Sequence, residues 1–145
     1  MDKVWWIDST VAVTLTADQT DGHAGMWLWE ATRGAAAPLH VHSREDEQFL
    51  VIDGEVRFLI DGKVSVAHAG EAVVMRRGVP HAYVVASPTA RIVGSVTPGG
   101  FEGFFTSLGT PVTDDDDPRP GPTVPQLVEG SGRFGVQILG PPPAL

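Results

Sequence analysis

The stretch FLVIDGEVRFLI, residues 49–60, constrains the fold most, because two short runs of alternating apolar residues flank an Asp-Gly pair. Alternation with a period of two places the apolar side chains on one face of a strand. Asp-Gly is a preferred pair in two-residue hairpin turns, whose central residues need positive φ. We therefore expect a hairpin at Asp53 and Gly54, in which Phe49 faces Phe58.

Similar short apolar runs recur along the chain and are separated by Gly, Asp or Pro. They occupy residues 11–15, 26–31, 72–75, 81–85 and 92–96. The 17 Gly and 12 Pro among 145 residues indicate many turns and little helix. Many short strands of this kind predict an all-β sandwich or barrel, and the length fits one domain.

The pattern changes after residue 97. Residues 1–112 are expected to form the barrel and a short helix that follows it in PGGFEGFFTSLG. Residues 113–145 are expected to form an acidic, proline-rich loop and a tail that packs on the barrel. Within this second part, the aspartate run 114–117 predicts a solvated loop and residues 123–139 predict one further short helix.

Net charge excludes two classes of partner. The chain carries a charge of -8 with ten Lys and Arg spread along it, so nucleic acid and anionic membrane surfaces are not expected to bind. No segment has the length and apolarity of a signal peptide or a membrane span, which predicts a cytoplasmic protein. Because the chain has no Cys, any metal must be held by nitrogen and oxygen ligands.

Four residues have the chemistry and the placement of metal ligands. His40 and His42 are two apart, which on a strand turns both imidazoles to one face. Glu47 shares the apolar face of Phe49, and His81 opens a later apolar run. We expect these four side chains to hold one divalent transition metal ion, for which Fe, Mn, Ni, Co, Cu and Zn all suit the ligand set.

The same counting predicts the residues around the metal. From His81, steps of two turn Tyr83 and Val85 inward, and Trp27 and Trp29 share one face of their strand. For the two Trp residues, core packing and pocket lining are both open. Glu47 and Tyr83 are the expected catalytic residues. The expected substrate-binding residues are Trp27, Trp29, Phe49, Val51, Phe58, Met75 and Val85, whereas His23 and His68 are expected at the surface.

The ligand residues belong to two longer motifs. The first, G-x5-HxH-x4-E-x6-G, is filled by Gly34, His40, His42, Glu47 and Gly54, and the second is matched by Gly70, Gly78 and His81. Arg76 and Val85 depart from the second motif, where Pro and Asn are usual. The chain resembles the single-domain, quercetinase-like members of the cupin superfamily. The resemblance implies a jelly-roll barrel of two antiparallel sheets with one or two short C-terminal helices, paired as a homodimer.

The resemblance also implies an activity. It suggests a metal-dependent dioxygenase of secondary metabolism that acts on a small aromatic or polyketide-like substrate with dioxygen. Glu47 would either stay as the fourth ligand or act as the base that takes a substrate proton. Two alternatives stay open, namely non-redox catalysis such as cyclisation, isomerisation, dehydration or decarboxylation, and binding of a small molecule without turnover.

Overall fold

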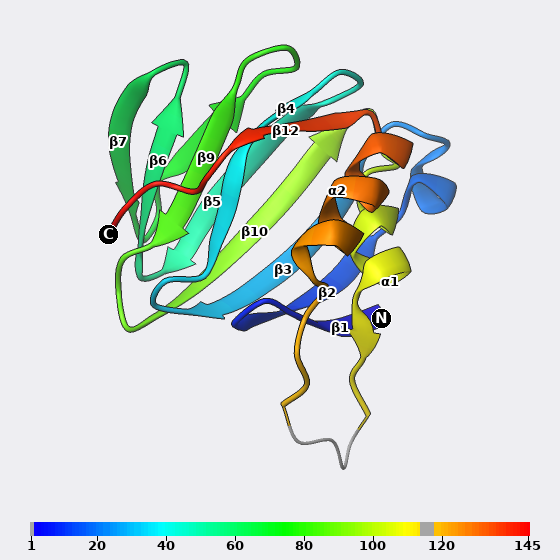
Figure 1. The fold of residues 1–145 in the computed structure, drawn as a ribbon. Coiled ribbons are helices and arrows are strands. Elements are labelled where there is room, and N and C mark those ends of the chain that lie inside the picture. Colours follow the sequence, from blue (N-terminus) through cyan, green and yellow to red (C-terminus); the bar gives the residue numbers. More distant parts are fainter. Residues whose placement is uncertain (1, 114–117) are drawn as a thin grey trace.

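Two antiparallel sheets face one another in the computed structural model, which describes residues 2–113 and 118–145 (Figure 1). Within these residues the first sheet has the strand order β11 (Thr110–Pro111), β1 (Asp2–Trp6), β2 (Ser9–Leu15), β3 (Gly25–Thr32), β10 (Thr89–Thr97), β5 (Asp46–Asp53) and β8 (Ala72–Met75). The second has the order β12 (Val136–Gly140), β4 (Ala36–His42), β9 (His81–Val85), β6 (Glu55–Ile60) and β7 (Lys63–His68). The predicted all-β jelly-roll class is confirmed.

The hairpin prediction for residues 49–60 is wrong. Strand β5 pairs with β10 and β8, whereas β6 pairs with β9 and β7 in the other sheet. Asp53 and Gly54 therefore carry the chain between sheets, and a two-residue hairpin lies instead at the next Asp-Gly pair, Asp61 and Gly62, with φ of 51° and 75°. The Asp-Gly signal is local and fits either position, so it does not determine which strands pair.

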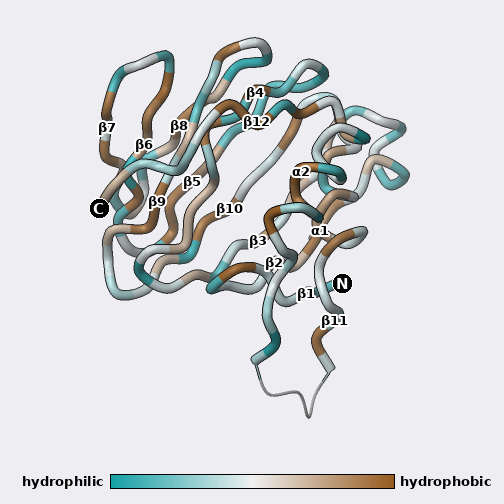
Figure 2. The backbone as a smooth tube through the Cα atoms, viewed as in Figure 1, coloured by the Kyte–Doolittle hydropathy of each residue, from teal (hydrophilic) through white to brown (hydrophobic). Residues whose placement is uncertain are grey.

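The predicted inward face is nevertheless the buried one. Phe49 on β5 and Phe58 on β6 are almost fully buried, and their ring centroids lie 6.0 Å apart across the two sheets. Figure 2 shows hydrophobic stretches along the strands and hydrophilic ones at many of the turns. Because a strand keeps its side-chain alternation whichever neighbour it pairs with, the face assignment survives the wrong pairing.

Two short helices stand at one end of the barrel, α1 (Gly103–Leu108) and α2 (Val124–Arg133), in contact with each other (Figure 1). The 3₁₀ helix η1 (Ala17–Thr20) precedes β3. A capping box of Thr123 and Gln126 starts α2, since each side chain accepts a hydrogen bond from the other's backbone N–H. No helix in residues 2–113 and 118–145 is long and apolar enough to span a membrane.

Strand β12 follows α2 and pairs with β4, which sets Val136 opposite His42 and Ile138 opposite His40. The sequence predicted no strand here. Strand β12 thus lies beside the strand that carries two of the expected ligands. The prediction for the aspartate run 114–117 falls outside the described residues.

Candidate metal centre

Three strands bring the four expected ligands to one place inside the barrel. β4 carries His40 and His42, β5 carries Glu47, and β9 carries His81, which is the register partner of His40. All four side chains are buried, and one ligand atom from each lies within 4.8 Å of the other three. The His42 and His81 rings are stacked with centroids 5.3 Å apart.

The outer nitrogen of each imidazole has a partner. Nδ1 of His40 lies 2.6 Å from the Pro38 carbonyl oxygen, and Nδ1 of His81 lies 3.0 Å from that of Val79. Because a carbonyl oxygen only accepts, Nδ1 of each ring is the donor, and in the neutral ring Nε2 then has a free lone pair. Nδ1 of His42 instead lies 2.6 Å from Oε1 of Glu45.

Burial and the neighbouring charges perturb these groups. Burial, with the charge of His81, lowers the pKa of His40 from 6.5 to about 4. Burial alone would lower the pKa of His42 and raise that of Glu47. For His42, the hydrogen bond to Glu45 and the charge of Glu47 outweigh burial, so its pKa is raised. For Glu47, the hydrogen bond to His81 and the charges of the three histidines outweigh burial, so its pKa is lowered. Glu47 is therefore a carboxylate near neutral pH, as ligation requires.

Unpaired atoms show that a cation fits the centre. His42 Nε2, His81 Nε2 and Glu47 Oε1 are buried and have no hydrogen-bond partner. The closest approach between Glu47 and His81 is 3.5 Å, too long for a strong hydrogen bond. Leaving a buried polar atom unpaired costs about 1–3 kcal/mol, so three at one point indicate a ligand. Three imidazoles and one carboxylate are a donor set for a divalent transition metal.

A cavity of about 100 Å³ adjoins the centre. His40, Glu47 and Tyr83 contribute its polar end. Its remaining walls are largely aromatic and apolar, and include Trp6, Val11, Trp27, Trp29, Phe49, Phe101, Phe104, Phe105, Leu127, Val136 and Ile138. No Lys or Arg of the described residues lines it, so the cavity suits an uncharged ligand.

The expected substrate-binding residues divide into two groups. Trp27, Trp29 and Phe49 line the cavity. The others are buried in the core without lining it, namely Val51, Phe58, Met75 and Val85. As expected, His23 and His68 are exposed.

Tyr83 lines the cavity between aromatic neighbours, with its ring centroid 4.8 Å from Phe49 and 5.5 Å from Trp29. Burial, with the nearby Glu47 charge, raises its pKa well above 10. The phenol therefore keeps its proton at neutral pH and can donate a hydrogen bond, but it is a poor base.

Two features of the site escaped the sequence reasoning. Glu45, which contacts His42, lies in the turn between β4 and β5, where no periodic pattern distinguishes a buried carboxylate from a solvated one. The cavity walls from Phe104, Phe105 and Leu127 come from helices whose position depends on tertiary packing. The cluster of Phe residues in PGGFEGFF was the available signal for the first helix.

Parts of this chain are similar in sequence to known proteins. Residues 27–93 match the Cupin domain family. The chain is 30% identical to quercetin 2,3-dioxygenase of Bacillus subtilis (strain 168) over 91 residues, which are 63% of this chain. The match spans 27% of that enzyme's length.

Among solved structures, KdgF from Halomonas sp. has a TM-score of 0.60 at 18% identity, covering 66% of this chain and 84% of that one. The polyketide cyclase RemF from Streptomyces resistomycificus has a TM-score of 0.54 at 19% identity, covering 62% and 65%. At such identities the likeness establishes the fold alone. Residues 27–93 of this chain are therefore a cupin domain, an assignment that the enzyme relative and the shared fold also support.

Proposed function

We propose that this chain is a metal-dependent enzyme, of the quercetinase-like dioxygenase type, that acts on a small aromatic or polyketide-like substrate. The observation that carries the proposal is the meeting of three unpaired buried atoms, from His42, Glu47 and His81, beside an aromatic cavity. The 30% identity to a quercetin 2,3-dioxygenase supports the reaction type.

His40, His42, Glu47 and His81 would hold the ion. The chemistry that a divalent transition metal supplies there is Lewis-acid polarisation of a substrate oxygen and, for the redox-active metals, activation of dioxygen. Burial and the Nδ1 hydrogen bonds keep His40 and His81 oriented for this task, since each ring is fixed by a carbonyl on its own strand or the turn before it.

The protein's own groups would bind and orient the substrate. Tyr83 is held protonated and can donate a hydrogen bond to a substrate oxygen at the polar end of the cavity. Glu47 is held ionised, so it can stay as a ligand or accept the proton of a substrate hydroxyl. The largely apolar walls lower the local polarity around both groups, which strengthens these interactions.

Cavity size narrows the substrate class. The volume of about 100 Å³ is well below the roughly 300–1,000 Å³ typical of sites for drug-sized ligands, and below the roughly 150 Å³ of an engineered cavity that binds benzene. Single-ring compounds therefore come closest to fitting. A substrate with two or three rings requires wall residues such as Leu127 to move.

A non-redox reaction, such as cyclisation, isomerisation, dehydration or decarboxylation, is the second candidate. It is favoured because a protonated phenol, Tyr83, and an ionised carboxylate, Glu47, line the same cavity. Such a pair supplies a hydrogen-bond donor and a proton acceptor without any oxidant.

The two candidates are separated by the metal that supports turnover. The purified protein is stripped of metal, reloaded with iron or zinc, and assayed for oxygen uptake with single-ring phenols. The dioxygenase proposal expects uptake with iron and none with zinc, because zinc has no redox chemistry. Full turnover with zinc and no oxygen consumed would instead establish the second candidate, and an absence of bound metal under all conditions would reject both.

We also infer a homodimer, because β7 and β8 are sheet edges with exposed apolar residues, including Val64 and Val74. Light scattering on the purified chain tests this, and a mass of one chain at all concentrations would refute it. The cytoplasmic location stays a prediction.

A further inference from the structure

Glu45 is a buried carboxylate outside the expected ligand set. The residue is 3% exposed, which is rare for Glu unless it is paired. It lies in the turn between β4 and β5, and its Oε1 is 2.6 Å from Nδ1 of His42. The distance is that of a short hydrogen bond between the imidazole N–H and the carboxyl oxygen.

His42 differs in this respect from the other two imidazoles. Backbone carbonyls, those of Pro38 and Val79, hold His40 and His81. The acceptor for His42 is a side-chain carboxyl, which can be removed by substitution without altering the backbone. The Glu45 bond is therefore the part of this hydrogen-bond framework that mutagenesis can test directly.

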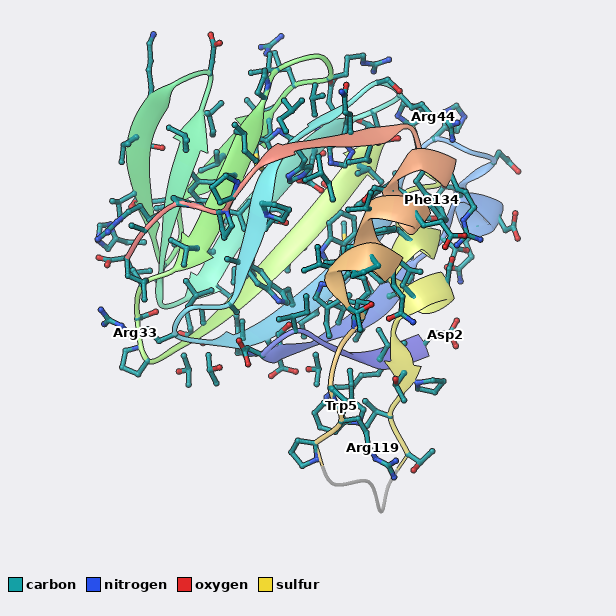
Figure 3. The ribbon with its side chains drawn as sticks, viewed as in Figure 1. Asp2, Trp5, Arg33, Arg44, Arg119 and Phe134 are labelled. Carbon is teal, nitrogen blue, oxygen red and sulfur yellow. The ribbon has the colours of Figure 1, made fainter. Side chains whose placement is uncertain are left out.

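Hydrogen bonds connect the turn that carries Glu45 to the segment between α2 and β12. The backbone N–H and the hydroxyl of Ser43 both donate to the Gly135 carbonyl, at 3.0 and 2.8 Å, and the Arg44 guanidinium donates to the Arg133 carbonyl at 3.3 Å. Figure 3 shows Arg44 near the end of α2 that leads to Phe134 and β12.

A side chain at Gly135 would be strained and would displace the side chains of Ser43 and Arg44. The φ of Gly135 is +71°, and a Cβ atom there would lie 2.7 Å from Ser43 Oγ and 2.8 Å from Arg44 Nε. Both acceptor residues, Arg133 and Gly135, lie outside residues 27–93, which match the cupin family, so this chain supports the turn with residues of its own C-terminal part.

We propose that Glu45 is a positioning residue for the candidate metal centre. Its carboxylate holds the proton of His42 on Nδ1 and fixes the ring, so that Nε2 presents its lone pair to the centre, and the junction of α2 and β12 holds Glu45 in place. Partners of this kind set the tautomer and orientation of ligating histidines. The inference rests on the proposed metal function, but its effect on His42 exists without metal.

The first test measures Co²⁺ affinity by competition with a chelator. Loss of a hydrogen-bonding partner behind a ligand typically weakens metal binding by about 10–100-fold, and we expect this for Glu45→Ala. Glu45→Gln should lose less, because its amide oxygen still accepts from Nδ1. The matched control is Glu71→Gln, because Glu71 also contacts a histidine three residues away, His68, but at the exposed surface. This control should bind Co²⁺ as the wild type does.

The second test uses ¹⁵N NMR of the His42 ring in metal-free protein at about pH 9, where the imidazole is neutral. The wild type should show the proton on Nδ1, and Glu45→Ala should shift the ring toward a mixture of tautomers. If wild-type protein binds no Co²⁺ but its tautomer depends on Glu45, the metal function fails and the positioning role stands. An unchanged tautomer together with unchanged Co²⁺ affinity in Glu45→Ala overturns the proposal.

A third variant, Gly135→Ala, tests the role of the junction. It should weaken Co²⁺ binding in the same direction as Glu45→Ala while unfolding stays cooperative. Wild-type affinity in this variant would remove the junction from the proposal. If Gly135→Ala does not fold, Ser43→Ala, which deletes one of the two Ser43 hydrogen bonds, gives the same comparison.

Discussion

The low pKa of His40 predicts that acid destabilises the metal-free protein. The folded-state pKa is about 4 and the ordinary value is 6.5. Between these values the unfolded chain binds a proton on His40 that the folded chain does not, so the free energy of unfolding falls as the pH falls through this window. The difference of about 2.5 pH units, at about 1.36 kcal/mol each, corresponds to about 3 kcal/mol.

Urea unfolding of metal-free wild type and His40→Gln, followed from about pH 7.5 to about pH 4, isolates this contribution. The variant cannot take up the proton, so the stability difference between the two proteins should change by up to about 3 kcal/mol across the window. The comparison also cancels most of the effect of His42, whose raised pKa acts in the opposite direction. His23→Gln, at an exposed position, should follow the wild type.

A stability difference between wild type and His40→Gln that stays constant with pH would refute the reasoning, because His40 would then titrate alike in the folded and unfolded chains. A bound metal should make the free energy of unfolding fall more steeply as the pH is lowered. Metal ligation needs the neutral imidazole, so the proton must also displace the ion.

Three further predictions concern the metal and the cavity. Protein purified without added metal should hold about one ion per chain, and His81→Ala or a chelator should lower metal content and the midpoint of thermal unfolding together; unchanged content in His81→Ala would show that this residue is no ligand. Tyr83→Phe should keep the fold but slow turnover about 2–12-fold, as the loss of one hydrogen bond worth about 0.5–1.5 kcal/mol requires, and full activity would exclude the phenol from substrate binding. Leu127→Ala should widen the cavity and cost less than the roughly 2–5 kcal/mol of a fully buried Leu-to-Ala change, because Leu127 is only partly buried. In this variant 2-naphthol should quench Trp fluorescence, whereas it should not in wild type; equal quenching in both would contradict the size limit.

The strands and their faces were largely predictable from sequence. The runs at residues 72–75 and 81–85 coincide with β8 and β9, and steps of two placed Glu47 with the buried Phe49. The motif spacing also selected four residues that the structure brings together. The alternation of apolar residues and the spacing of ligands within a motif can both be read from short segments of sequence.

Strand pairing was less predictable. The sequence placed β5 beside β6, but they lie in opposite sheets, and it contained no warning that β12 would pair with β4. Residues 63–68, which form β7, likewise were not recognised. Hydrogen bonds between strands use backbone groups that every residue has, so local sequence constrains the partner weakly.

The sequence by itself determined which side chains face inward and which four could ligate a metal, since both follow from the geometry of a single strand. The tertiary structure decided that the ligand atoms meet, that Glu45 reaches His42, and that α1, α2 and β12 close the cavity. The ligand cluster and the cavity join residues far apart in the chain, and they depend on how two sheets and two helices pack, which no local pattern encodes. Glu45 is only three residues from His42, but whether its carboxyl turns inward depends on the conformation of the turn.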